Sequence, residues 1–157
     1  MLLTQQGMLA IDSPNGWVRA DGPGLAYFVP KAGTTAANNV FIYISSAPIG
    51  PTEDTKNLKE YVESDIAGFK HRFKSGVITE ETPIDLPFAK SKAPAYTFCS
   101  AEVNNAFEKI VYIAEKNRVL ILALSAKKKD AFDESQSVFR QFVQSYRGSL
   151  AETAPGR

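Results

Sequence analysis

The sequence has 157 residues, 44% hydrophobic and 22% charged, a length and balance that suit one folded domain and exclude a disordered chain. Lys and Arg number 18 and Asp and Glu 17, so the net charge is +1 and the basic excess typical of nucleic-acid-binding proteins is missing. A single cysteine, Cys99, rules out an intramolecular disulfide, and no apolar run approaches the ~20 residues of a membrane-spanning helix.

The first residues of the sequence contain neither the basic nor the apolar region of a signal peptide. Two locations therefore stay open for the domain: the cytoplasm, or export with a signal peptide that is not part of this chain. The oligomeric state stays open as well.

The first third of the chain is expected to be rich in short strands, at Met8–Ile11, Leu25–Val29 and Val40–Ser46. Turns separate them at Ser13-Pro14-Asn15-Gly16 and Asp21-Gly22-Pro23-Gly24, because proline presets φ and glycine accepts a positive φ. In the strand that begins at Val40, successive apolar side chains point to opposite faces of the sheet, so both faces of this strand are apolar.

A helix is predicted next, because apolar residues recur at spacings of 4, 4, 3 and 4 and so share one face. These residues are Leu58, Val62, Ile66, Phe69 and Phe73. Glu53 and Asp54 precede them, where negative charge suits a helix N-terminus, and Gly76 is the expected terminator.

An antiparallel meander follows, with strands expected at Val77–Thr82, Ala95–Val103, Ala106–Ala114 and Arg118–Ala126. Asn104-Asn105 is the predicted turn between the second and third of these strands. The last strand is apolar on both faces, so we expect it at the centre of a sheet whose two faces are covered.

A second helix is predicted from Asp130, a good N-cap, to Gly148, a terminator. Its apolar face consists of Phe132, Phe139, Phe142, Val143 and Tyr146. The expected fold is therefore α+β: a three-layer α/β/α sandwich with a central antiparallel sheet of six or seven strands and one long helix on each face. Residues 1–148 form this single domain, and residues 149–157 form a flexible C-terminal tail.

Residues that could carry catalysis are few. His71, the only histidine, lies about 200° around the predicted helix from Phe69 and so points away from its apolar face. Cys99 lies inside a strand, where we interpret it as a small buried hydrophobic residue. One histidine and one cysteine, far apart in the sequence, argue against a zinc site and against a Cys-His pair. We expect no catalytic residue, no metal and no cofactor, while a carboxylate pair assembled by the fold stays open.

Lys127, Lys128 and Lys129 form the one local run of charge, directly before the second predicted helix. Backbone N–H groups at a helix N-terminus can hold an anion, so these lysines are a candidate site for a small anion or an acidic partner. The alternative is a solvated turn with Asp130 capping the helix.

Three segments of the chain follow a pattern that is found in other proteins. They are the strand, turn and Trp of Ile11–Trp17, the start of the first helix at Leu58–Val62, and the closing pattern of Ser125-Ala126, a charged turn, Phe132 and the helix from Phe139 to Tyr146 and Arg147. Together these segments resemble the PsbP-like superfamily. This superfamily includes the extrinsic PsbP subunit of photosystem II, a nuclear transport factor that binds the Ran GTPase, and bacterial exported proteins. The resemblance implies an α/β/α sandwich with a non-enzymatic binding role, and it supplies no catalytic residues.

Three functions follow, in order of preference. The first is a non-catalytic interaction module, bacterial, with an unknown protein partner, which predicts an exposed apolar or aromatic patch. The second is a small-ligand carrier with an apolar pocket between helix and sheet. The third is an enzyme of unrecognised type, which predicts a cleft that holds titratable groups with shifted pKa values.

Overall fold

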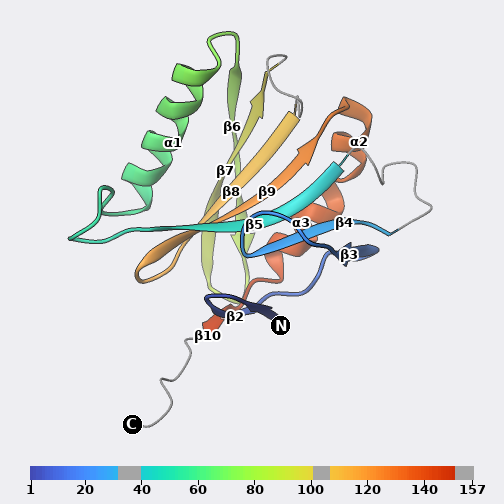
Figure 1. Ribbon diagram of the computed structural model, residues 1–157, viewed down its shortest axis with the longest axis horizontal. Coiled ribbons are helices and arrows are strands. Elements are labelled where there is room, and N and C mark those ends of the chain that lie inside the picture. Colours follow the sequence, from blue (N-terminus) through green and yellow to red (C-terminus); the bar gives the residue numbers. More distant parts are fainter. Residues whose placement is uncertain (32–39, 101–106, 151–157) are drawn as a thin grey trace.

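The computed structural model describes residues 1–31, 40–100 and 107–150 (Figure 1). Within these ranges the chain forms ten strands and three helices. The strands make two antiparallel sheets, one of seven strands and one of three, so the described chain is mostly β. The expected Asn104-Asn105 turn lies outside the described residues.

The large sheet has the spatial order β3-β4-β5-β9-β8-β7-β6. Its strands are β3 (Trp17–Arg19), β4 (Ala26–Pro30), β5 (Val40–Pro48), β6 (Val77–Leu86), β7 (Ser91–Cys99), β8 (Phe107–Ala114) and β9 (Arg118–Ala126). β9 occupies the middle position, with β5 along one side and β8 along the other, and every residue from Val119 to Ala126 is buried. The central position predicted for this apolar strand is confirmed.

Two apolar clusters lie against the large sheet. The larger one contains Phe28, Phe139 and Phe142, and the rings of Phe28 and Phe142 meet edge-on with centroids 5.7 Å apart. The smaller one joins Tyr112 to Val62 of helix α1 (Leu58–Arg72). Most of the apolar burial that stabilises the domain therefore comes from the larger cluster.

Helix α1 begins later than the sequence predicted. Asn57 caps it, because its side-chain Oδ1 accepts a hydrogen bond of 3.0 Å from the Glu60 N–H, and Glu53 and Asp54 lie in the preceding turns. Of the expected apolar face only Val62 is buried. The helix consequently covers only part of the sheet, toward β7 and β8 (Figure 1).

The second predicted helix is broken in two. Helix α2 (Lys129–Glu134) ends at Ser135, which is buried, and helix α3 (Gln136–Gln144) follows it directly. Lys128, and not Asp130, occupies the N-cap position of α2. Phe132 and Phe139 are seven residues apart and face the same core. The helical spacing of apolar residues therefore continues across the break, and for this reason the sequence predicted one continuous helix.

The small sheet has the order β1-β2-β10, made by β1 (Leu2–Thr4), β2 (Gly7–Ala10) and β10 (Gly148–Leu150). Strand β2 pairs with both others, so the two ends of the described chain lie side by side (Figure 1). An ion pair supports the junction, with Arg147 Nη2 2.9 Å from Asp12 Oδ1. Ser149 and Leu150, expected in the C-terminal tail, belong to β10, and residues 151–157 lie outside the description.

The expected three-layer α/β/α sandwich is therefore wrong. The described chain is mostly β in two separate sheets, and it has one long helix and two short ones in place of two long helices. The physical reason is that short terminal strands pair with each other, the break at Ser135 divides the last helix, and α1 leaves part of its sheet face uncovered.

Strand β6 forms one edge of the large sheet and is longer than predicted. Its pairing with β7 shifts register between Glu81 and Ile84, so Thr82 and Pro83 form an irregularity within the strand. Pro83 has no N–H to offer a further strand, and the bulge twists this edge. The expected loop after Thr82 is thus a continuation of the strand.

Candidate functional site

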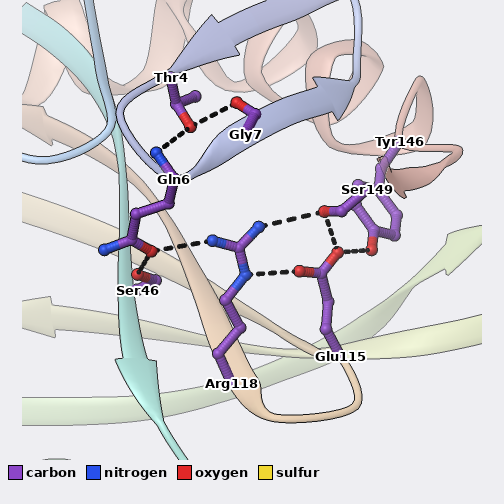
Figure 2. A network of polar contacts seen from close by, with 8 residues as sticks. All are labelled: Thr4, Gln6, Gly7, Ser46, Glu115, Arg118, Tyr146 and Ser149. Carbon is purple, nitrogen blue, oxygen red and sulfur yellow. Dashed lines mark hydrogen bonds and ion pairs between the residues drawn. The ribbon is translucent and has the colours of Figure 1, made fainter. Parts of the chain in front are cut away.

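A network of polar side chains joins the tip of the β8–β9 hairpin to the small sheet (Figure 2). At its centre, Arg118 Nε donates to Glu115 Oε1 over 2.7 Å. The hydroxyl of Tyr146 donates to Glu115 Oε2 over 2.5 Å, and the hydroxyl of Ser149 donates to the same oxygen. On its other side Arg118 donates to the Gln6 side-chain oxygen over 3.0 Å.

The hairpin geometry explains why Glu115 and Arg118 meet. They flank the two turn residues Lys116 and Asn117, and the Glu115 N–H donates to the Arg118 carbonyl over 2.8 Å, which closes the hairpin. The two side chains are only 12% and 18% exposed. A shielded pair of this kind is stronger than a solvated surface pair.

Electrostatics at Glu115 follow from its partners. Burial acts to raise the pKa of this carboxyl group, but the hydrogen bonds from Ser149, Tyr146 and Arg118 outweigh it, so the pKa lies below its ordinary value. The pKa of Tyr146 is raised, first by burial and then by its bond to Glu115. Glu115 is therefore ionised and Tyr146 is protonated at neutral pH.

A cleft of about 530 Å³ lies beside this network. Its lining includes the charged and amide side chains of Gln6, Lys116, Asn117 and Arg118, together with Leu150 at the end of β10. Because Glu115 already neutralises Arg118, Lys116 is the remaining cation among the described residues of the lining. The cleft is therefore suited to binding polar groups.

We predict that Glu115→Gln lowers the free energy of unfolding by about 1.5 kcal/mol at pH 7, because a charged acceptor of three hydrogen bonds is lost. The pKa of Glu115 is lower in the folded chain than its ordinary value of 4.5, so ionised Glu115 stabilises the fold at pH values above 4.5. This stabilisation is lost as the pH falls below that value. Urea unfolding at pH 7 and pH 3 should show a large difference between variant and parent at pH 7 and a small one at pH 3.

Glu134→Gln is the matched control, since Glu134 is exposed at the end of α2, and a change within about 0.5 kcal/mol is expected at both pH values. Equal losses for Glu115→Gln at pH 7 and pH 3 would contradict the electrostatic account of the network.

A second group of polar contacts lies on the sheet face toward α1. Tyr43 Oη of β5 donates to Glu108 Oε1 of β8 over 2.5 Å, and Tyr112 Oη donates to a carboxylate oxygen of Asp65 on α1. Burial raises the pKa of Glu108, and the nearby negative charge of Asp65 raises it further. The hydrogen bond from Tyr43 lowers this pKa but does not outweigh the effect of burial. On this face, one tyrosine hydroxyl thus holds Glu108 and another holds Asp65.

The lysine run predicted as an anion site lies at the start of α2. Lys127, Lys128 and Lys129 are all exposed, and Lys129 Nζ is 2.6 Å from Asp133 Oδ2 one turn later. α2 has only six residues. The anion site therefore stays a prediction, and the geometry of these lysines adds no further support for it.

The two other residues weighed for chemistry lie apart from the cleft. His71 is exposed near the end of α1, on the outer side of the helix as predicted. Cys99 was expected to be buried inside a strand, but it is only half-buried because it is the last residue of β7. Among the described residues, no three His, Cys, Asp or Glu side chains are placed so that they could hold a metal ion.

Neither polar group was predicted from the sequence. Glu115 and Arg118 carry a signal in hindsight, because opposite charges on either side of a tight turn face each other across a hairpin. Their partners Tyr146, Ser149 and Gln6 carry none, since the contacts are made across 31 residues or more.

Comparison with known proteins gives a match by structure alone. No family model and no curated protein matches the sequence. The solution structure of cyanobacterial PsbP (CyanoP) from Synechocystis sp. PCC 6803 matches with a TM-score of 0.55 over 87% of this chain and 84% of that one. The chain has a PsbP-like fold. Sequence identity is 13%, so the PsbP-like likeness concerns the fold and carries no residue roles.

The resemblance noted in the sequence is thereby confirmed at the level of the PsbP-like fold, although the layer arrangement expected from it was wrong. In the described residues, no helix is both long and apolar enough to cross a membrane. The antiparallel sheet predicted for the core is present.

Proposed function

We propose that this PsbP-like domain is a non-catalytic protein-binding module. The observation that carries the proposal is a row of apolar side chains on the outer face of the small sheet. Leu3 pairs with Met8, and Met8 pairs with Leu150, so one side chain from each strand lies in a line across all three strands.

This apolar row is solvent-exposed. Leu3 is 65% exposed, Leu150 53% and Met8 36%, whereas Leu2 and Leu9 on the opposite face are buried in the larger core cluster. Both faces of the small sheet therefore carry apolar side chains, but only one face packs against the rest of the chain and the other face is exposed. Contiguous exposed apolar side chains on a soluble fold mark interaction surfaces.

A polar margin adjoins the apolar row. Leu150 also lines the 530 Å³ cleft, whose other lining residues include Lys116, Asn117 and Arg118. An apolar centre with a polar rim is the usual composition of a protein–protein interface. The hydrogen bonds from Arg118 to Gln6 and Ser149 hold this rim in place.

The alternative of a small-ligand carrier draws less support. The cleft exceeds about 300 Å³, the lower end of ligand-pocket volumes. Its position at the hairpin tip and its charged and amide lining differ from the apolar pocket between helix and sheet that a carrier for apolar ligands needs.

A crosslinking experiment tests the proposal. A photo-crosslinking amino acid is placed at Met8 in the full chain, and adducts formed in the native host are identified by mass spectrometry. The expected result is one protein, or a small set, captured reproducibly, and this capture should fall at least tenfold when Leu3→Lys and Leu150→Lys are added, because charges at the row disfavour apolar contact.

The matched control places the same crosslinker at Val77, which is 60% exposed at the start of β6. The adducts at Val77 should differ from those at Met8 and should be indifferent to the two lysines. Identical adducts at both positions, or capture at Met8 that the lysines leave unchanged, would count against the apolar row as a binding surface.

A further inference from the structure

A ladder of aromatic side chains extends along the part of the sheet face that α1 does not cover. The ring of Tyr27 on β4 stacks on Phe41 of β5 with centroids 5.2 Å apart, and Phe41 lies 6.0 Å from Tyr43. All three are half-buried. We call Tyr27, Phe41 and Tyr43 the aromatic ladder.

Strand register places the aromatic ladder on the same face as α1. Tyr27 pairs with Tyr43, Tyr43 with Ala123, Ala123 with Ile110, and Ile110 with Tyr96, so these residues form one row across five strands. At the far end of this face, Tyr96 packs edge-on against Tyr112, whose ring meets Tyr61 of α1. The helix thus covers one end of the face and the aromatic ladder lies at the other.

Small residues in the middle strand connect the ladder to a carboxylate. β9 contributes Ala123 and Ser125 to this face, opposite Tyr43 and Phe41 of β5. Because both are small, the Tyr43 side chain can lie across β9, and its hydroxyl reaches Glu108 on β8 at 2.5 Å. One end of the ladder is therefore joined directly to an acidic group.

The acidic group has no cation beside it within the described part of the chain. Glu108 accepts from Tyr43 and is close enough to feel the charge of Asp65, and neither carboxylate takes part in an ion pair with a described Lys, Arg or His. Burial of a carboxylate without a cation costs free energy. A cation supplied from outside would reduce that cost.

We propose that the aromatic ladder and Glu108 form a docking surface for a protein segment that presents an arginine side chain. This surface lies on strands other than those of the apolar row, so it goes beyond the proposed function and is tested separately.

The chemistry favours arginine as the occupant. A guanidinium group stacks on aromatic rings, is weakly hydrated, and pairs with a carboxylate through a planar set of donors. The ladder offers the rings, and Glu108 offers an oxygen other than the one bonded to Tyr43. Three rings in sequence make a surface longer than one side chain, which suits a chain segment with apolar residues beside the arginine.

The test uses two probes of equal shape and different charge. N-acetyl-arginine methylamide and N-acetyl-citrulline methylamide are titrated into the full chain and followed by NMR. The arginine probe should shift resonances of Tyr27, Phe41, Tyr43 and Glu108, and bind at least tenfold more tightly than the neutral citrulline probe. A blocked peptide of sequence Gly-Leu-Arg-Leu-Gly should bind at least tenfold more tightly than the single arginine.

Variants locate the binding. Glu108→Gln keeps an acceptor for Tyr43, and Phe41→Leu keeps apolar bulk without a ring; each should weaken the arginine probe at least fivefold while the NMR spectrum stays that of a folded chain. Glu63→Gln, at an exposed acid of α1, is the charge control and should leave binding unchanged. Equal binding of arginine and citrulline, shifts elsewhere on the surface, a peptide no tighter than arginine alone, or indifference to Glu108→Gln would each overturn the proposal.

Discussion

Phe142→Ala is expected to lower the free energy of unfolding by about 3–5 kcal/mol. Phe142 is 2% exposed on α3, and its ring contacts Phe28 of the sheet and Phe139 of the same helix. Truncation removes buried apolar area and leaves a cavity that a close-packed core fills only in part. Chemical denaturation monitored by circular dichroism measures the loss.

Phe88→Ala is the matched control, because it deletes the same atoms at a position that is 63% exposed. Truncation removes a contact with the Arg147 guanidinium, which lies 5.8 Å from the ring centroid, and little buried area, so the change should stay below about 1 kcal/mol. Similar losses for the two variants would show that α3 does not pack on the sheet through Phe142.

Gly24→Ala is expected to destabilise the domain by about 3 kcal/mol or more. Gly24 has φ +85°, which costs an L-residue about 1–2 kcal/mol. An added Cβ would also lie 2.4 Å from the Ile44 carbonyl oxygen, which accepts the Leu25 N–H at 2.7 Å. Because that oxygen belongs to the backbone of β5, relief requires moving the strand, and overpacking of this kind adds about 1–3 kcal/mol.

Gly16→Ala separates the two contributions. Gly16 has nearly the same backbone angle, φ +80°, but an added Cβ there meets no described atom within 4 Å. Its cost should be about 1–2 kcal/mol, from the backbone conformation alone. Thermal or urea unfolding of the two variants side by side should give a clear gap, and equal costs would mean that β4 and β5 are not held as closely as Gly24 implies.

The features that the sequence predicted well depend on local patterns. A strand apolar on both faces had to be central, and Val119–Ala126 lies between β5 and β8 in the middle of the large sheet. The proline- and glycine-rich turns mark the ends of short strands, as expected. Residues close in sequence carried all the information these predictions needed.

Features formed by distant residues were missed. Leu2–Thr4 and Gly148–Leu150 have three residues each, too few to show a period of two, and each is stable only through β2. The last helix was predicted as continuous because the break at Ser135 leaves the aromatic spacing intact. Together with the partial cover given by α1, these misses made the predicted layer arrangement wrong.

The candidate site shows the same division. Lysines in a row are visible in a sequence, but Lys129 pairs within its own helix. The contacts of Glu115 and Arg118 with Tyr146, Ser149 and Gln6, and the bond from Tyr43 to Glu108, join residues that are 31 or more positions apart. Only the Glu115–Arg118 pair could have been predicted, from its place beside a hairpin turn.

Pairing of β2 with β10 sets an order of events during synthesis. The ion pair beside these strands joins residues 135 positions apart, so a ribosome must release nearly all of the described chain before the small sheet can close. Until then Leu2 and Leu9 lack part of their cover, and β1 and β2 form an isolated hairpin of marginal stability. The surface that carries the apolar row is consequently completed only after β10 has been synthesised, so shorter nascent chains lack the three-stranded form of this surface.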